Sequence, residues 1–370
     1  MESLEIFLVA PPGLEPLLAD EARAAGFAGV TARAGGVALR GGWPEVWRAN
    51  LELRGASRVL ARIAAFRALH LAQLDRRARR LDWAAVLRPD VAVKVEATCR
   101  ASRIYHAGAA AERVARAIRE ERGAPVENDA GLRILVRIED DLCTISLDTS
   151  GEPLHRRGHK QALNPAPMRE TLAALFLRAC GYQGREPVLD PMCGAGTFVI
   201  EAAEIAARLM PGRSRVFAFE SLASFDAGAW ARLRARPPAA APPAQFFGSD
   251  RDAGAIAMSR ANAERAAVAA FTRFERAPIS DLARPEGPPG LVIVNPPYGG
   301  RIGNRKLLFA LHATLGRVLR ERFAGWRVGL VTADAGLAKA TGLPFGLPGP
   351  VVPHGGLKIR LWQAAPLPVE

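Results

Sequence analysis

Residues 187–203 read PVLDPMCGAGTFVIEAA: a short apolar run, a loop with two glycines, and a second run whose apolar residues recur with helical periodicity. This order predicts a strand, a tight loop and a helix. Gly194 and Gly196 allow the backbone to turn sharply and to approach a ligand closely. The helix that begins at Thr197 would point its unpaired N–H groups into the same space, so we expect a ligand at this loop.

The glycine loop does not fit the dinucleotide-binding fingerprint. That fingerprint needs a third glycine three positions after the second, where this chain has Val199, and no acidic residue ends a strand at the usual distance. A nicotinamide cofactor is therefore disfavoured. Because many α/β proteins turn on glycines with nothing bound, the loop alone leaves the ligand open.

A second motif narrows the choice of ligand for the glycine loop. Residues 291–299 read LVIVNPPYG, a buried type of strand that ends abruptly in Asn-Pro-Pro-Tyr. Two prolines cannot continue a central strand, so we expect the chain to leave the sheet at Asn295 and to present Tyr298 at the carboxyl edge, where α/β sheets bind ligands. An ordinary proline-rich loop is the alternative, and the presence of the glycine loop disfavours it.

Together the two motifs resemble those of class I S-adenosylmethionine-dependent methyltransferases that act on exocyclic amino groups of nucleobases. The resemblance implies an α/β fold, with a Rossmann-like, seven-stranded, mostly parallel sheet, and S-adenosylmethionine as the cofactor. It implies a catalytic motif formed by Asn295, Pro296, Pro297 and Tyr298. The cofactor-binding residues that it implies are Asp190, Pro191, Cys193, Gly194, Gly196, Thr197, Asp250, Asp281 and Asn295.

Two of these acidic residues follow predicted strands. The strand over residues 245–250 ends in Asp250, whose carboxylate could accept both hydroxyls of a ribose, as the equivalent acid does in the family. Asp252 and Glu220 are competitors for this role, and Asp252 could equally cap the next helix. Asp281 resembles the acid that lies beside the adenine amino group in the family.

The expected chemistry needs hydrogen-bond acceptors rather than a strong base. An exocyclic amine is a poor nucleophile because its lone pair is delocalised into the ring, and acceptors that take its two protons localise that pair. The Asn295 side-chain oxygen and the Pro296 carbonyl are placed for this, with Tyr298 stacking on a base that has left its own stack.

The motif does not separate adenine N6 from guanine N2. The order of motifs along the whole chain resembles the L type of large-subunit ribosomal RNA methyltransferases, which act on guanine N2, so we expect 23S ribosomal RNA as the substrate. Some members of that family carry a second methyltransferase domain, and here we expect a single activity. The alternatives are adenine N6 in RNA or DNA, guanine N2 in transfer RNA, and an RNA-binding adaptor without catalysis.

Composition indicates a globular protein with an anionic partner. The 370 residues allow two or three domains, and 50 Lys and Arg against 37 Asp and Glu leave a net charge of +13, which favours nucleic acid. No apolar run is long enough for a membrane span and the start lacks a signal peptide's basic region, so we expect a cytoplasmic protein without membrane attachment. The cysteines show neither paired spacing nor nearby histidines, so we expect no metal and no disulfide framework.

The first half of the chain has the order of a small α/β module. Strict alternation over residues 91–97 predicts a strand, and it is followed by a predicted helix over 107–122 and strands over 132–139 and 141–148. This order resembles a THUMP domain, which in its families binds structured RNA. The expected domains are a ferredoxin-like part over 1–60, a THUMP RNA-binding domain over 61–155 and a methyltransferase domain over 160–370.

A basic tract lies in the same half, where residues 54–103 hold twelve Arg and Lys against four Asp and Glu. Its first arginines recur near helical spacing between apolar residues, which predicts an amphipathic helix with one positive face; they are Arg54, Arg58, Arg62 and Arg67. The densest cluster follows at Arg76, Arg77, Arg79 and Arg80. Each group could bind RNA phosphates or could be an ordinary solvated face.

Four further cations are expected to contact RNA. Arg157 lies in the polar segment 154–161, which resembles a His-x-Arg-Gly segment that precedes the catalytic domain in the family. Arg301, Arg305 and Lys306 follow the Asn-Pro-Pro-Tyr motif directly and could bind phosphates beside the target base. An ordinary basic loop is an equally good reading of those three.

Overall fold

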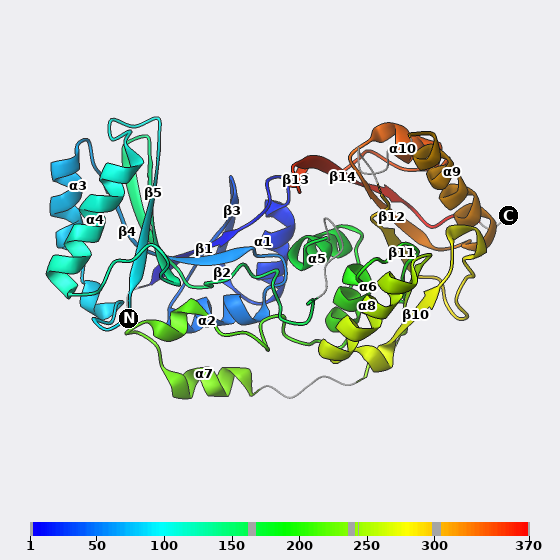
Figure 1. Ribbon diagram of the computed structural model, residues 1–370, viewed down its shortest axis with the longest axis horizontal. Coiled ribbons are helices and arrows are strands. Elements are labelled where there is room, and N and C mark those ends of the chain that lie inside the picture. The colour runs from blue at the N-terminus through cyan, green and yellow to red at the C-terminus, as the bar shows by residue number, and fades with distance from the viewer. Residues whose placement is uncertain (1–2, 162–167, 236–240, 243, 298–304, 369–370) are drawn as a thin grey trace. The chain divides into compact units, whose positions relative to one another are not determined.

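The computed structural model describes residues 3–161, 168–235, 241–242, 244–297 and 305–368. The chain divides into two compact units, each with a seven-stranded sheet (Figure 1). The first unit comprises Met1–Ala10, Leu18–Leu154 and Gly212–Arg236, and the second Pro11–Leu17, His155–Pro211 and Pro237–Glu370. None of the helices in the described ranges combines the length and apolar content needed to cross a membrane.

The sheet of the first unit begins with a ferredoxin-like half. Strand β1 (Leu4–Val9) lies between β3 (Gly36–Gly41) and β4 (Arg58–Arg67) and pairs antiparallel with both, while β2 (Ala28–Arg33) adds an edge strand to β3. Helices α1 (Glu15–Ala24) and α2 (Trp43–Glu52) follow β1 and β3 along the chain.

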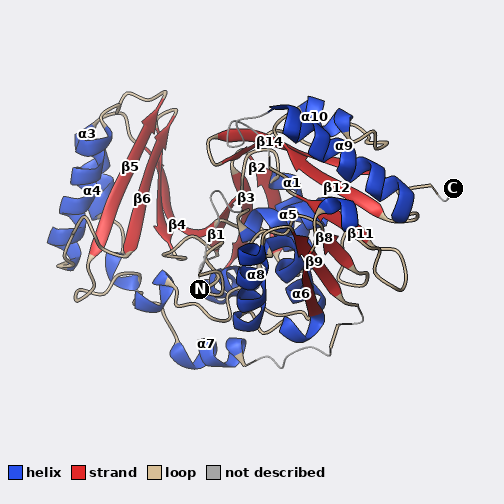
Figure 2. Cartoon of the chain, turned by 45° about the vertical axis from the view of Figure 1, so that its right-hand side comes forward, coloured by secondary structure: helices blue, strands red, loops and turns tan. Residues whose placement is uncertain are grey.

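The same sheet continues beyond β4 in the order β2-β3-β1-β4-β7-β6-β5. In this half only the pair β5–β6 is parallel, and buried Ile134 and Val136 of β6 alternate with Arg133 and Arg137. Helices α3 and α4 lie along these strands (Figures 1 and 2). The elements are α3 (Leu71–Arg79), η1 (Trp83–Ala85), β5 (Val93–Arg100), α4 (Ala107–Arg122), β6 (Leu132–Glu139) and β7 (Leu142–Asp148).

The helix expected from the spacing of the arginines between 54 and 67 is wrong, because residues 58–67 form strand β4. A spacing of four is even, so Arg58 and Arg62 also share one face of a strand. Beyond them the register shifts at a bulge between Arg62 and Ala64, which accommodates the odd spacing to Arg67.

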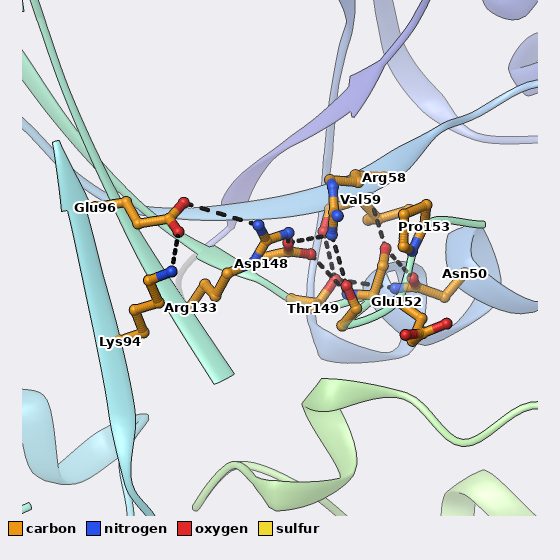
Figure 3. A network of polar contacts seen from close by, with 12 residues as sticks. Asn50, Arg58, Val59, Lys94, Glu96, Arg133, Asp148, Thr149, Glu152 and Pro153 are labelled. Carbon is orange, nitrogen blue, oxygen red and sulfur yellow. Dashed lines mark hydrogen bonds and ion pairs between the residues drawn. The ribbon is translucent and has the colours of Figure 1, made fainter. Parts of the chain in front are cut away.

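Most of the arginines on these strands form hydrogen bonds or ion pairs with acidic side chains. The carboxylate of Asp148, which is fully buried, accepts hydrogen bonds from Arg58 and Arg133 (Figure 3). Burial lowers the pKa of Arg58, although the neighbouring Asp148 acts in the opposite direction. Arg62 forms an ion pair with Glu5. The predicted positive face is therefore mostly a neutralised, partly buried network.

The segment Gly212–Arg236 belongs to the first unit, although the chain before it and after it belongs to the second. It contains η2 (Ala218–Ser221) and α7 (Ala227–Arg234) and builds an aromatic cluster on α2. The ring of Phe219 lies 6.1 Å from that of Trp47 and 5.0 Å from that of Trp230, centroid to centroid. Large apolar area is buried in such contacts, so this segment is anchored rather than loose.

The second unit contains the expected seven-stranded, mostly parallel sheet, in the order β10-β9-β8-β11-β12-β14-β13. The first five strands pair in parallel, and β14 is antiparallel to both β12 and β13. The strands are β8 (Val188–Asp190), β9 (Phe246–Asp250), β10 (Thr272–Arg276), β11 (Leu291–Val294), β12 (Arg327–Thr332), β13 (Val352–His354) and β14 (Leu357–Ala364).

Helices cover this sheet and close its core. Leu315 and Leu319 of α9, together with Phe323 directly after it, are fully buried in one cluster with Val292 and Val294 of β11, so the strand that leads to Asn295 has a rigid support. The helical elements are α5 (Glu170–Ala179), α6 (Thr197–Ala206), α8 (Ala253–Arg265), η3 (Ala269–Phe271), η4 (Ile279–Asp281), α9 (Arg305–Arg322) and α10 (Ala335–Ala340).

Candidate cofactor and nucleobase site

The glycine loop connects the end of β8 to the start of α6. Gly194 and Gly196 have φ values of +54° and +81°, which only glycine adopts readily. A Cβ atom on Gly196 would lie 3.2 Å from both the Phe274 ring and the Ser259 Cβ, so there is little room for a side chain. The loop therefore presents its backbone, with the first N–H groups of α6 behind it.

Three of the expected site residues follow neighbouring parallel strands. Strand β8 lies between β9 and β11, and these three strands lead to Asp190, Asp250 and Asn295 respectively. Because the carboxyl ends of parallel strands meet at one edge of the sheet, these side chains gather there. This edge is the candidate site.

Asp250 is tied directly to the glycine loop. Its Oδ2 accepts a hydrogen bond from the Gly194 N–H at 3.0 Å, and its Oδ1 accepts one from the Asp252 N–H at 3.0 Å. The two competitors have other contacts. Asp252 caps α8 by accepting from the Gly254 N–H, and Glu220 accepts from the Phe217 N–H within the first unit.

Asp190 is buried at the end of β8. Burial is the largest cause that raises its pKa to about 8; the neighbouring charge of Asp250 adds to the shift, and the hydrogen bond that Asp190 accepts from the Met192 N–H opposes it. At neutral pH this carboxyl group is therefore mostly protonated, and it can donate as well as accept a hydrogen bond.

Side chains of α8 hold the loop from behind, and the sequence did not reveal them. Ser259 Oγ donates to the Gly194 carbonyl at 2.7 Å, and Asn262 Nδ2 donates to the Ala195 carbonyl at 3.0 Å. The thiol of Cys193 lies 3.7 Å from Ser259 Oγ, and burial raises its pKa well above the usual range. Cys193 thus offers its backbone, and not a thiolate, to a ligand.

Lys160 supports the start of α6. Its ammonium group donates to the Met168 carbonyl at 2.7 Å and to Thr197 Oγ1 at 2.9 Å. It also forms an ion pair with Glu170 at 3.3 Å. The side-chain hydroxyl of Thr197, expected to bind the cofactor, is therefore engaged by a buried lysine, which in the sequence is only one of several polar residues in the segment 154–161.

Asn295 provides the unsatisfied group of the site. Its Oδ1 is buried and has no hydrogen-bond partner among the residues that the structure describes. A buried acceptor without a donor costs about 1–3 kcal/mol, which a ligand amine could recover. Pro296 next to it is buried and Pro297 is exposed, whereas Tyr298 and Arg301 lie outside the described residues.

The remaining candidates lie in different surroundings. Asp281 is exposed and belongs to the turn η4, five residues after β10, so it does not end a strand as expected. Arg305 and Lys306 are exposed in the first turn of α9. Arg305 lies 3.8 Å from Asp334 and keeps most of its side chain in solvent, so its charge is accessible to a polyanion.

The RNA contact expected for Arg157 is wrong, because the side chain is buried. Its side chain is only 2 % exposed and forms ion pairs with Glu201 and, at 3.3 Å, with Glu204. The two acids sit one turn apart on the otherwise apolar helix α6, and such buried acids require a cation. The two acids in the apolar stretch 197–206 were the sequence signal that could have predicted a buried cation such as Arg157.

The chain matches three domain families. These are the RlmL ferredoxin-like domain over residues 5–60, the THUMP domain over residues 70–148 and the RMKL-like methyltransferase domain over residues 157–344. It is 37 % identical, over 360 residues, to the ribosomal RNA large subunit methyltransferase K/L of Syntrophotalea carbinolica, with 92 % of this chain and 50 % of that protein covered. The chain thus spans about half the length of the curated relatives it matches.

Solved structures with the same fold cover all or nearly all of the chain. A protein described as a possible methylase from Clostridium difficile 630 is 27 % identical with a TM-score of 0.87, and the match covers 100 % of this chain and 99 % of that one. A protein described as a predicted N6-adenine-specific DNA methylase from Listeria monocytogenes is 28 % identical with a TM-score of 0.88, with coverages of 98 % and 96 %.

Proposed function

Because this chain belongs to the RMKL-like methyltransferase family, we propose that it transfers a methyl group from S-adenosylmethionine to the exocyclic N2 amino group of a guanine in 23S ribosomal RNA. S-adenosylmethionine is the cofactor of this fold and family. The observation that carries the reaction type is the buried Oδ1 of Asn295, which has no hydrogen-bond partner in the described part of the chain and lies at the sheet edge that also holds the glycine loop. The names of the curated relatives support ribosomal RNA as the substrate.

The residues at the sheet edge fit the cofactor. Gly194 and Gly196 have no side chains, so a ligand can approach the backbone at the start of α6. Asp250 has a half-buried carboxylate suited to the hydroxyls of a ribose. Asp190, mostly protonated, would add a donor without adding a second negative charge beside Asp250. When bound, S-adenosylmethionine supplies a methyl group on a positively charged sulfur, so the protein has to position the acceptor and exclude water.

Asn295 and Pro296 would activate the acceptor. The Oδ1 atom of Asn295 and the carbonyl of Pro296 would each accept one proton of the exocyclic amine, which localises the nitrogen lone pair for attack. The fixed φ of proline holds the second acceptor in one geometry. Tyr298 completes the proposed catalytic set as the side chain that stacks on the base.

Three exposed arginines support RNA as the partner. Arg76, Arg77 and Arg80 of the α3 region are exposed and form no ion pair with any residue that the structure describes. Arg79 between them is instead paired with Asp75, Glu120 and Glu121. With Arg305 and Lys306 in the second unit, these cations would bind RNA phosphates. Ribosomal RNA as the substrate would place the reaction in the cytoplasm.

The test is methyl transfer from labelled S-adenosylmethionine to total cellular RNA from a strain that lacks this protein, followed by nucleoside digestion and mass analysis. We expect the label in N2-methylguanosine of large-subunit ribosomal RNA. Label in N2-methylguanosine of transfer RNA would change the substrate and keep the chemistry. No transfer to any RNA or DNA would overturn the proposal.

Adenine N6 is the second candidate. The Asn-Pro-Pro-Tyr motif is compatible with either amine, and the protein from Listeria monocytogenes carries the description of an N6-adenine-specific DNA methylase. The same experiment separates the two, because label in N6-methyladenosine, or in DNA only, would favour this candidate.

A further inference from the structure

A cluster of exposed apolar and basic side chains lies at one end of the sheet in the first unit, where β4 and β5 end and β6 turns into β7. Arg67 at the end of β4 pairs with Leu142, and Arg100 at the end of β5 pairs with Glu139. The Asp140 N–H donates to the Arg100 carbonyl at 3.3 Å, which joins these strand ends (upper end of β5 and β6 in Figure 2). The cluster, here called the tip, comprises Arg67, Leu69, Arg100, Arg103, Tyr105 and Leu142.

The tip exposes an unusual amount of apolar surface. Tyr105 is 84 % exposed, Leu142 43 % and Leu69 38 %, so three of the eight large apolar residues that are exposed in the described part of the chain belong to this one place. Single exposed apolar residues need no explanation, but a cluster of them marks a binding surface.

The loop that carries Tyr105 is built to hold the ring outward. Ile104 before it is buried, and His106 after it caps α4 by accepting a hydrogen bond from the Ala109 N–H at 2.9 Å. The Arg103 N–H donates to Asp141 Oδ1 at 2.8 Å, and the Asp141 N–H donates to Ser102 Oγ at 3.1 Å. Because the backbone on both sides of Tyr105 is anchored, binding through the ring orders only its side chain and costs little backbone entropy.

The backbone at the tip is also strained. Ala101, Asp140 and Asp141 have φ values of +46°, +50° and +62°, and they are three of the five non-glycine residues with positive φ in the described ranges. Asp140 and Asp141 form the two-residue turn between β6 and β7, where positive φ at both residues is usual, whereas at Ala101 it is a strain of order 1–3 kcal/mol of the kind found at functional sites. Here they place Arg103 and Tyr105 beside the turn between β6 and β7.

We propose that the tip is a second RNA contact, in which Tyr105 stacks on an unpaired base while Arg100 and Arg103 bind the flanking phosphates. The side chains of Arg100 and Arg103 are 81 % and 71 % exposed, so their ion pairs with acids at 3.5 and 4.0 Å leave them accessible. A ring flanked by arginines on a chain of net charge +13 favours a nucleic acid over a protein partner. Because it takes RNA as the partner, this inference rests on the proposed function.

The stacking contact predicts an unpaired base, in a loop, a bulge or a single strand, because a base inside a helix has no free face. Tyr105→Ala removes the ring, whereas Tyr105→Phe keeps it and loses only the hydroxyl. Since the ring is exposed, both variants should fold like the wild type. Leu347→Ala, at an exposed apolar residue of the second unit, is the matched control.

The experiment measures the affinity of the full chain and its variants for 23S ribosomal RNA by filter binding, together with methyl transfer to the same RNA. We expect Tyr105→Ala to weaken binding about 10-fold, within the range of one lost base stack, and Tyr105→Phe and Leu347→Ala to bind like the wild type. A photoreactive benzoylphenylalanine at position 105 should cross-link to a base that lies outside helices.

The outcomes separate this inference from the proposed function. Wild-type affinity of Tyr105→Ala, on an RNA that the wild type binds and methylates, would overturn the contact and leave the proposed function intact. Cross-linking of position 105 to a protein in a ribosomal precursor, and not to RNA, would also overturn it. Absence of RNA binding by the wild type itself would overturn both.

Discussion

The backbone N–H of Gly194 donates a hydrogen bond of 3.0 Å to Asp250 Oδ2, and this bond joins the glycine loop to the end of the neighbouring strand. One carboxylate thereby orders the loop and, in the proposed function, accepts the ribose of the cofactor. The two roles are linked, because an ordered loop presents its N–H groups without further loss of entropy on binding.

We therefore expect Asp250→Ala to weaken the binding of S-adenosylhomocysteine at least 10-fold, since hydrogen bonds to a charged group contribute about 1.5–3 kcal/mol. Isothermal titration calorimetry measures this directly. Asp252→Ala is the matched control: it removes an acid two residues away that only caps α8, so it should reduce stability by about 1 kcal/mol and leave the affinity unchanged. Equal affinities of the two variants would contradict the role of Asp250.

Asn295→Ala should separate chemistry from cofactor binding. Loss of an acceptor that acts on the amine in the transition state should lower kcat about 10²-fold or more, while the dissociation constant of S-adenosylhomocysteine stays nearly the same. Single-turnover methyl transfer and calorimetry on the same preparation give both numbers. A variant that retains the wild-type rate would exclude Asn295 from catalysis.

The second unit was largely predictable from its sequence. The short apolar runs that end at Asp190, Asp250 and Val294 are buried strands of a parallel sheet, and local glycine and proline chemistry marks where each strand stops. Local rules therefore placed the candidate residues at strand ends, whereas the roles proposed for them come from the family resemblance. Ser259 and Asn262 did not, because nothing local distinguishes a polar helix residue that supports a loop from one that faces solvent.

The first unit shows where local rules fail. Strand β2 carries no fully buried residue, so it has no alternation that would predict a strand. In β4, arginines at even spacing satisfied the helical pattern and the strand pattern equally, and only pairing with β1 and β7 decides between them. The burial of Arg157 depends on acids more than 40 residues away, so the residues around Arg157 do not reveal it, and the signal lies instead in the two acids of the otherwise apolar helix α6.

The protonation of Asp190 should make stability depend on pH. Its folded-state pKa of about 8 lies above its usual value of 3.8, so between these values the folded state retains a proton that the unfolded chain has released, and stability is lost as the pH rises through this window. Asp190→Asn keeps the neutral shape and removes the titration. We expect the stability of the variant relative to the wild type to increase steadily from pH 5 to pH 8, as measured by urea denaturation; a pH-independent difference would show that Asp190 is not protonated.

Arg157→Met should act on stability and not on RNA affinity. Removal of the cation takes away the ion pairs that Arg157 forms with the buried Glu201 and Glu204, which costs about 3–5 kcal/mol. Thermal denaturation should show a clear decrease in Tm, whereas RNA affinity, measured at a temperature where the variant is folded, should match the wild type. Arg156→Met removes an exposed neighbouring charge and is the control. A stable Arg157→Met protein with weakened RNA binding would restore the RNA contact expected from the sequence.

The exposed arginines of the α3 region should determine part of the salt dependence of RNA binding. Each phosphate contact that is lost reduces the slope of log K against log salt by a little less than one, so the triple variant Arg76→Gln, Arg77→Gln and Arg80→Gln should show a slope smaller by up to about three. Arg79→Gln removes a cation that is already paired with three carboxylates, and it should leave the slope nearly unchanged. If Arg79→Gln reduced the slope as much per charge as the triple variant does, the effect would reflect net charge alone, and these arginines would form an ordinary solvated face.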